Sequence, residues 1–196
     1  MSIKVSELSQ AKKVLSNEYT SVREYIEKTP RPIRPEVVDL FPALEKTILD
    51  RRRVCRTLQS GKSYRFRILV AVGCKVQGII GLGVAKGKTM PQAIDKAQRE
   101  AKKNLICLKK ISEGEQLTRF GPTRQAFAKM GATGVTITPL PDGESVTSSK
   151  FGKDYCRVAG ITNIRISTCN KGRYKRGKVA SRLNYYTALH AALKLS

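Results

Sequence analysis

Two strand-like runs near the middle of the chain place the strongest constraint on its fold. They read RRRVCRTL at residues 51–58 and SYRFRILVAVG at residues 63–73, and the turn-like QSGK separates them. In the second run apolar residues alternate with Arg65 and Arg67 before the run becomes wholly apolar. Because period-two alternation is typical of a half-buried β-strand, the sequence predicts a β-hairpin here.

The residues that follow predict a third strand and a helix. GCKVQG suits a hairpin loop, and IIGLGV makes a returning strand. Thr89 is a candidate cap and Pro91 a candidate first-turn residue for a helix over residues 91–106. Its expected apolar face carries Ile94, Ala97, Ala101 and Leu105. We therefore expect a three-stranded antiparallel sheet with one helix over residues 44–112.

The first 43 residues are interpreted as an N-terminal extension. Apolar residues recur at helical spacing between residues 6 and 29, and PRPIRP then forces an extended connector. A second short helix is expected at about residues 36–49. The extension is either solvated or docked onto a neighbouring molecule.

Residues 113–125 are polar and turn-rich, and we interpret them as a linker. Beyond them, residues 126–196 read as strand GVTITPL, helix FGKDYCRVAGI, strand NIRISTC and helix SRLNYYTALHAALKL. That order predicts a two-layer β-α domain. The expected fold class of the whole chain is α+β.

The net charge of the chain indicates its class of partner. There are 38 Lys and Arg against 15 Asp and Glu, a net charge of +23. A surplus of this size repels itself unless a polyanion neutralises it, so nucleic acid is the expected partner and anionic membrane the alternative. No apolar run approaches the roughly 18 residues of a spanning helix, which weakens the membrane alternative.

The basic residues gather in two clusters. No acidic residue occurs between residues 51 and 67, and Asp154 is the only acid between residues 150 and 182. No sequence-specific DNA-binding motif is present, so recognition of RNA shape through phosphates and 2′-hydroxyls fits better. The candidate RNA-binding cations are Arg52, Arg53, Arg56, Lys62, Arg65, Arg67, Lys75, Lys171, Arg173, Lys175, Arg176 and Lys178.

The stretch GLGVAKGKT at residues 81–89 resembles a nucleotide-binding loop without matching its spacing. A Walker loop ending at Gly87-Lys88-Thr89 needs glycine at position 82, which is Leu82 here. We interpret Gly81 and Gly83 as positions for strand geometry or close RNA approach. Lys86 and Lys88 are expected to meet RNA phosphates.

Catalytic and metal-binding signals are weak. The five cysteines form no CxxC pair, and His190 is the one histidine, on an apolar helix where a core or boundary role is expected. The scattered cysteines indicate reduced thiols in an intracellular compartment. We expect no catalytic residue, no metal, no cofactor and no small-molecule substrate; an RNA-modifying enzyme is the alternative of a different class.

Four blocks of sequence resemble the small-subunit ribosomal protein number five family. They are LEKTILDRRRVCRTLQSGKSYRFRILVAVG, GIIGLGVAKGKTMPQAIDKAQREAKKNLI, KMGATGVTITPLPDGESVTSS and RVAGITNIRI…NYYTALHAAL, in family order over about residues 44–193. The resemblance implies an N-terminal double-stranded-RNA-binding-like domain followed by a β-α domain. It also implies that the hairpin loop with Gln59, Ser60 and Gly61 reaches into small-subunit RNA.

The same resemblance implies a non-enzymatic, structural role in the small ribosomal subunit. The implied partners are its RNA and the neighbouring proteins of the four and eight families, near the messenger entry channel, with an effect on decoding accuracy. The chain departs from the family pattern at Gly143-Glu144-Ser145 and Ser148-Ser149. Together with the N-terminal extension and the five cysteines, these departures favour a divergent mitochondrial member, with the bacterial cytoplasm or a plastid as alternatives. A non-ribosomal RNA-binding or RNA-processing protein is the alternative function.

Overall fold

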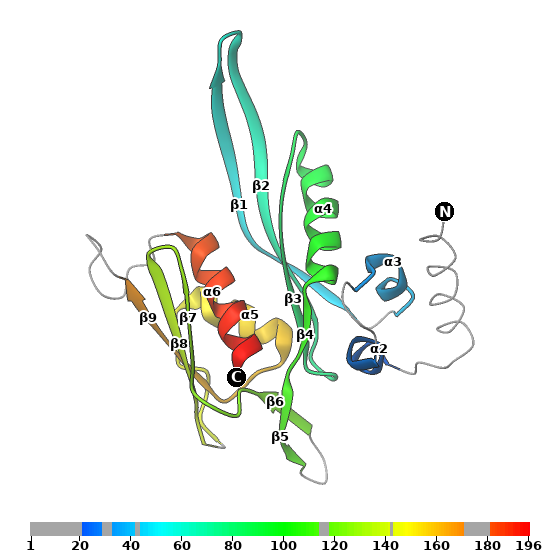
Figure 1. Ribbon diagram of the computed structural model, residues 1–196, viewed down its shortest axis with the longest axis vertical. Helices are drawn as coiled ribbons and strands as arrows, with labels where there is room; N and C mark the ends of the chain where they lie inside the picture. The colour runs from blue at the N-terminus through cyan, green and yellow to red at the C-terminus, as the bar shows by residue number, and fades with distance from the viewer. Residues whose placement is uncertain (1–20, 29–32, 42–43, 114–117, 142, 171–180) are drawn as a thin grey trace.

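The computed structural model describes residues 21–28, 33–41, 44–113, 118–141, 143–170 and 181–196 (Figure 1). A four-stranded antiparallel sheet forms its N-terminal half, with strand order β1-β2-β3-β4. The strands are β1 (Glu45–Leu58), β2 (Gly61–Cys74), β3 (Ile79–Gly87) and β4 (Leu105–Cys107). The mixed α and β content agrees with the expected class, and the sheet has one strand more than the three expected.

The predicted hairpin is formed by β1 and β2, which pair from Glu45 opposite Gly73 to Leu58 opposite Gly61. A turn at residues 59–60 connects them, and Gly61 takes a φ of 126°, which glycine adopts without the strain a side chain brings. The expected helix over residues 36–49 is wrong beyond its first turn. Helix α3 spans Pro35–Val38, and residues 45–49 are strand because β2 supplies their hydrogen-bonding partners.

Helix α4 (Met90–Lys103) packs on one face of this sheet through small residues. Ala93, Ala97 and Ala101 are fully buried against Ile68, Val70 and Val72 of β2. The expected apolar face was right at Ala97 and Ala101 but wrong at Leu105, because the helix ends before that residue. Leu105 instead belongs to β4, where it pairs with Gly81 of β3. Pro91 lies in the first turn, as predicted.

Gly81 and Gly83 let α4 approach the sheet at backbone distance. A Cβ on Gly81 would collide with the carbonyl oxygen of Ala101, and one on Gly83 with that of Ala97. Both glycines are buried beneath the helix, so the expectation of close RNA approach at these two positions is wrong. The same burial leaves no room for a phosphate against their backbone.

The C-terminal half is a three-stranded antiparallel sheet with two helices on one face. Its strands β7 (Ala126–Met130), β8 (Thr133–Pro139) and β9 (Ile164–Asn170) lie in the order β7-β8-β9. The helices are α5 (Lys150–Ala159) and α6 (Arg182–Leu195). The expected strand, helix, strand and helix occur at β8, α5, β9 and α6, and β7 is an additional strand. Gly160, at a φ of 71°, ends α5 in the left-handed conformation.

The two halves share one hydrophobic core. Leu69 and Leu82 of the first sheet belong to the same buried cluster as Ile137 of β8, Tyr155 of α5 and Leu189 of α6. Helices α5 and α6 therefore lie between the two sheets, as Figure 1 shows. The predicted linker region contains β6 (Thr118–Gly121), which pairs with β5 (Lys109–Glu113).

The described part of the N-terminal extension packs on its own chain. Val22 and Tyr25 of α2 (Val22–Lys28) and Val37 of α3 are buried with Ile79 and Leu105 of the first sheet. Residues 21–28 and 33–41 are therefore neither a solvated arm nor free to dock elsewhere through these side chains. No helix among the residues described here combines the length and apolar character needed to cross a membrane.

Candidate nucleic-acid interface

The hairpin formed by β1 and β2 projects beyond the rest of the fold (Figure 1). Along β2 the outer residues are exposed or half-buried, whereas every residue from Ile68 to Cys74 is buried. We call residues 51–67 the outer hairpin. The outer hairpin contains seven cations and no acid, so it is a concentrated positive surface on an extended support.

The strand register divides these cations between the two faces of the hairpin. Arg52 lies opposite Arg67, and Lys86 of β3 lies on the other side of Arg67. Arg56 and Arg65 share this face, because residues two apart in a strand point to the same side. The sheet thus places five predicted RNA-binding cations side by side: Arg52, Arg56, Arg65, Arg67 and Lys86.

The opposite face of the outer hairpin carries a stacked pair. The guanidinium carbon of Arg53 lies 3.8 Å from the ring centroid of Tyr64, which is 45% exposed. Stacking on an aromatic ring holds the guanidinium plane while leaving its N–H groups free to bind phosphate. Arg51 and Lys62 lie on this same face. Tyr64 and Arg51 were not among the candidates, and the two-residue alternation already visible in β2 could have found Tyr64.

Asp50 ends the cationic run at the base of the outer hairpin. Its Oδ2 forms an ion pair with Nε of Arg52 at 3.1 Å, and its Oδ1 accepts a hydrogen bond from Nη1 of Arg182 at 3.0 Å. Arg182 also lies 4.5 Å above the ring of Phe151 in α5. These contacts join the base of the hairpin to α5 and α6, and they neutralise part of the charge of Arg52.

Lys86 and Lys88 are exposed at the corner between β3 and α4. The backbone N–H of Lys88 donates to the side-chain oxygen of Gln92. Both side chains are exposed and therefore available to an anion, and their contact with RNA phosphates stays a prediction. The turn residues Gln59, Ser60 and Gly61 are also exposed, at the tip of the hairpin.

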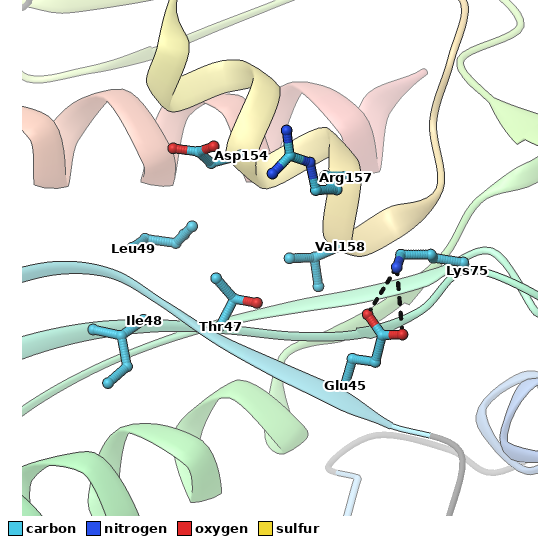
Figure 2. A pocket seen from close by; sticks show the side chains of 8 residues that line it. All are labelled: Glu45, Thr47, Ile48, Leu49, Lys75, Asp154, Arg157 and Val158. Atoms are coloured by element: carbon cyan, nitrogen blue, oxygen red, sulfur yellow. Dashed lines mark hydrogen bonds and ion pairs between the residues drawn. The ribbon is translucent and has the colours of Figure 1, made fainter.

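Lys75 lies apart from the other candidates, after the inner end of β2. Its Nζ is 3.0 Å from Oε2 of Glu45, and the pair borders a cleft of about 190 Å³ between β1 and α5 (Figure 2). Asp154 and Arg157 of α5 face the same cleft. Lys75 is therefore engaged with a carboxylate at the opposite end of the sheet from the hairpin tip. The candidates Lys171, Arg173, Lys175, Arg176 and Lys178 lie outside the described residues.

The buried polar groups of α5 and α6 have the character of a core. The hydroxyl of Tyr155 and Nδ1 of half-buried His190 share a hydrogen bond of 2.8 Å, which agrees with the expected core or boundary role of the histidine. Burial raises the pKa of Cys156 to about 12 and raises the pKa of Tyr155 well above its usual value. A thiol this difficult to ionise is a poor nucleophile.

None of the five cysteines, all within the described residues, forms a disulfide, and their exposure ranges from buried Cys74 and Cys156 to exposed Cys55 and Cys169. Within the part of the chain that the structure describes, no three His, Cys, Asp or Glu side chains form a group that could hold a metal ion.

Comparison with known proteins places the chain in a family. A family model described as ribosomal protein S5, N-terminal domain, matches residues 44–109. Small ribosomal subunit protein uS5 of Pyrobaculum islandicum is 34% identical over 164 residues, covering 82% of this chain and 77% of the relative. The uS5 protein of Methanocaldococcus jannaschii is 33% identical over 176 residues, covering 87% and 77%.

The uS5 protein of Methanothermobacter thermautotrophicus is 32% identical over 183 residues, which cover 89% of this chain and 79% of the relative. These alignments extend well beyond residues 44–109, so the similarity includes the C-terminal sheet and its helices. The resemblance seen in the four sequence blocks is confirmed. This chain belongs to the ribosomal protein S5 family.

Proposed function

We propose that this chain is a structural constituent of the small ribosomal subunit and that it binds ribosomal RNA through the outer hairpin. The observation that carries the proposal is the projecting hairpin whose two faces carry seven cations and no acid between them. A surface of this kind attracts a polyanion, and it contains no acidic residue that would repel the polyanion. The relatives are named small ribosomal subunit protein uS5, which points to ribosomal RNA of the small subunit as that polyanion.

The hairpin binds RNA mainly through the phosphate backbone. Arginine offers two parallel N–H donors that match two phosphate oxygens, and five of the described cations lie on one face of the sheet, spread over three strands. Each neutralised phosphate releases counterions, so the affinity falls as salt rises. The turn at Gln59 and Ser60 leads the hairpin into the RNA, and Gly61 keeps that turn narrow.

The finer assignments rest on the family resemblance. They are contacts with neighbouring proteins of the four and eight families, a position near the messenger entry channel, and support of translational accuracy. The likeness of residues 44–112 to a double-stranded-RNA-binding domain belongs with them, and α4 on one face of an antiparallel sheet supports it. The mitochondrial location stays a prediction, with bacterial cytoplasm and plastid as alternatives, and fractionation of cells carrying the tagged protein tests it.

Sedimentation tests the proposed function. Tagged protein should co-migrate with small subunits through a sucrose gradient at low magnesium, where subunits separate. A variant in which Arg56, Lys62 and Arg65 are glutamine should shift toward the top of the gradient. Protein found only in free RNA complexes would instead favour the non-ribosomal RNA-binding or RNA-processing alternative.

A further inference from the structure

The outer face of the C-terminal sheet is not covered by any element among the described residues. Helices α5 and α6 lie on the inner face, where Ala128, Val135, Ile137, Ile164 and Ile166 are buried (Figure 1). The alternate residues of the same strands point the other way; those on β7 and β9 are exposed, and Thr136 and Thr138 on β8 are half-buried. We call this the open face, and its members are Phe127, Lys129, Gly134, Thr136, Thr138, Arg165, Ser167 and Cys169.

Phe127 lies on the open face, with its ring over Gly134 of the neighbouring strand. A Cβ on Gly134 would be 2.9 Å from Cε2 and 3.0 Å from Cζ of the ring, so the ring rests on the bare backbone of Gly134. The residue is nevertheless 54% exposed. The far end of the ring is therefore supported by the sheet, while about half of the residue stays exposed and accessible to a planar group.

The residues around Phe127 are cations and hydroxyls. Thr136 lies directly opposite Phe127, and Ser167 lies opposite Thr136. Lys129 and Arg165 are exposed on the same face. None of the three strands contains an acidic residue. The open face thus offers one aromatic platform, the three hydroxyls of Thr136, Thr138 and Ser167, and two positive charges.

We propose that the open face binds unpaired nucleotides of an RNA strand, with one base stacked on Phe127. Every base has a π-face, so an aromatic platform of this kind accepts bases whatever their sequence. Lys129 and Arg165 contact the phosphates on either side of the stacked base, and the hydroxyls of Thr136 and Ser167 bond to base edges or 2′-hydroxyls. This is a second RNA surface, separate from the outer hairpin, and it stands whether or not the hairpin proposal does.

Two properties favour unpaired RNA over the alternatives. A protein partner would be expected to cover a larger apolar area, and Phe127 is the only large apolar side chain among the open-face residues. A duplex hides its bases within the stack and leaves none to lie on the ring. The positive charge and the single aromatic platform together fit an unpaired strand.

Tryptophan fluorescence provides a direct test, because the protein contains no tryptophan. In the full chain, Phe127→Trp places the one fluorophore on the open face, and Val76→Trp places it in the exposed turn between β2 and β3 as a control. Ten-nucleotide oligouridylate should quench the emission of Phe127→Trp saturably and leave that of Val76→Trp unchanged. A blunt RNA duplex of ten base pairs should quench neither.

A second measurement isolates the contribution of the ring to affinity. In a background with Arg56, Lys62 and Arg65 changed to glutamine, Phe127→Ala should weaken oligouridylate binding about 5- to 150-fold, the range for losing one stacked base. Circular dichroism checks that the variant is folded. Binding of oligouridylate without quenching at residue 127, or equal quenching by the duplex, would overturn the proposal. Emission that responds to small-subunit proteins but not to oligouridylate would assign the face to a protein.

Discussion

The inner and outer halves of the β1–β2 hairpin are built from the same two strands and differ in what stabilises them. Residues 68–74 of β2 are buried between α4 on one side and α5 with α6 on the other. Residues 61–67 make the same ladder of hydrogen bonds to β1 but bury little apolar surface. The inner half therefore contributes to the hydrophobic core and to stability. The outer half is a projecting, positively charged surface that depends on the inner half for its position.

The inner half should be the more sensitive to added volume. Gly83→Val places a side chain against the carbonyl of Ala97, where backbone has to move. We expect a loss of more than about 3 kcal/mol in the free energy of unfolding, measured by urea denaturation. Thr57→Val on the outer half is the control and should change that free energy by less than about 0.5 kcal/mol. Equal effects at the two positions would contradict the division.

The outer half should dominate RNA binding. Changing Arg56, Lys62 and Arg65 to glutamine should lower the slope of log affinity against log salt by about 2 to 3, or roughly 100-fold in affinity at 0.1 M salt. Removing the same charge from exposed Lys96, Arg99 and Lys194 is the control. Filter binding to small-subunit RNA measures both, and an equal slope change in the two triple variants would show that only net charge matters.

Asp50 lies where the two halves meet, and its removal should affect both. Its side chain is 10% exposed and holds two arginines, so Asp50→Asn should cost about 1–2 kcal/mol of unfolding free energy. The same change frees Arg52 and should raise RNA affinity slightly. Glu45→Gln breaks the exposed pair with Lys75 and should cost less than about 0.5 kcal/mol. A rise in stability for Asp50→Asn would refute a joining role.

The smallest effect is expected in mild alkali. Cys156 has its pKa raised by burial from 9.0 to about 12, so the unfolded chain loses this proton first and stability falls as pH rises from 9 toward 12. At pH 9.5 the loss from this thiol should stay below about 1 kcal/mol. Denaturation of Cys156→Ala at pH 7.5 and 9.5 should show a smaller difference than the wild type. Cys55→Ser, on the exposed outer half, should leave that difference unchanged.

The elements that sequence reading found are those whose signal is local. Arginines alternating with apolar residues indicated β2, and Pro91 indicated the start of α4. Residues 45–49 were misread because their strand is imposed by pairing with β2, which no short window contains. Strand β4 is too short, at three residues, to show a period of two.

The sequence revealed which residues make up the candidate site but not how they are arranged in space. The acid-free run indicated the outer hairpin, but the row formed by Arg52, Arg67 and Lys86 depends on the register of three strands. A pattern of glycines also does not reveal which group packs closely against them. At Gly81 and Gly83 that group is the backbone of α4. Lys75 was predicted as an RNA-binding cation because of its charge alone, and its ion pair with Glu45 depends on the fold.

The shared core has a consequence for the order of events during synthesis. Leu69, Ala71, Ile80 and Leu82 leave the ribosome early, yet their buried partners on α6, such as Leu189, are made more than a hundred residues later. Until α5 and then α6 are made, the first sheet has one face covered by α4 and one bare apolar face. The nascent chain therefore stays incompletely folded over this interval, and the packing of α6 completes its hydrophobic core.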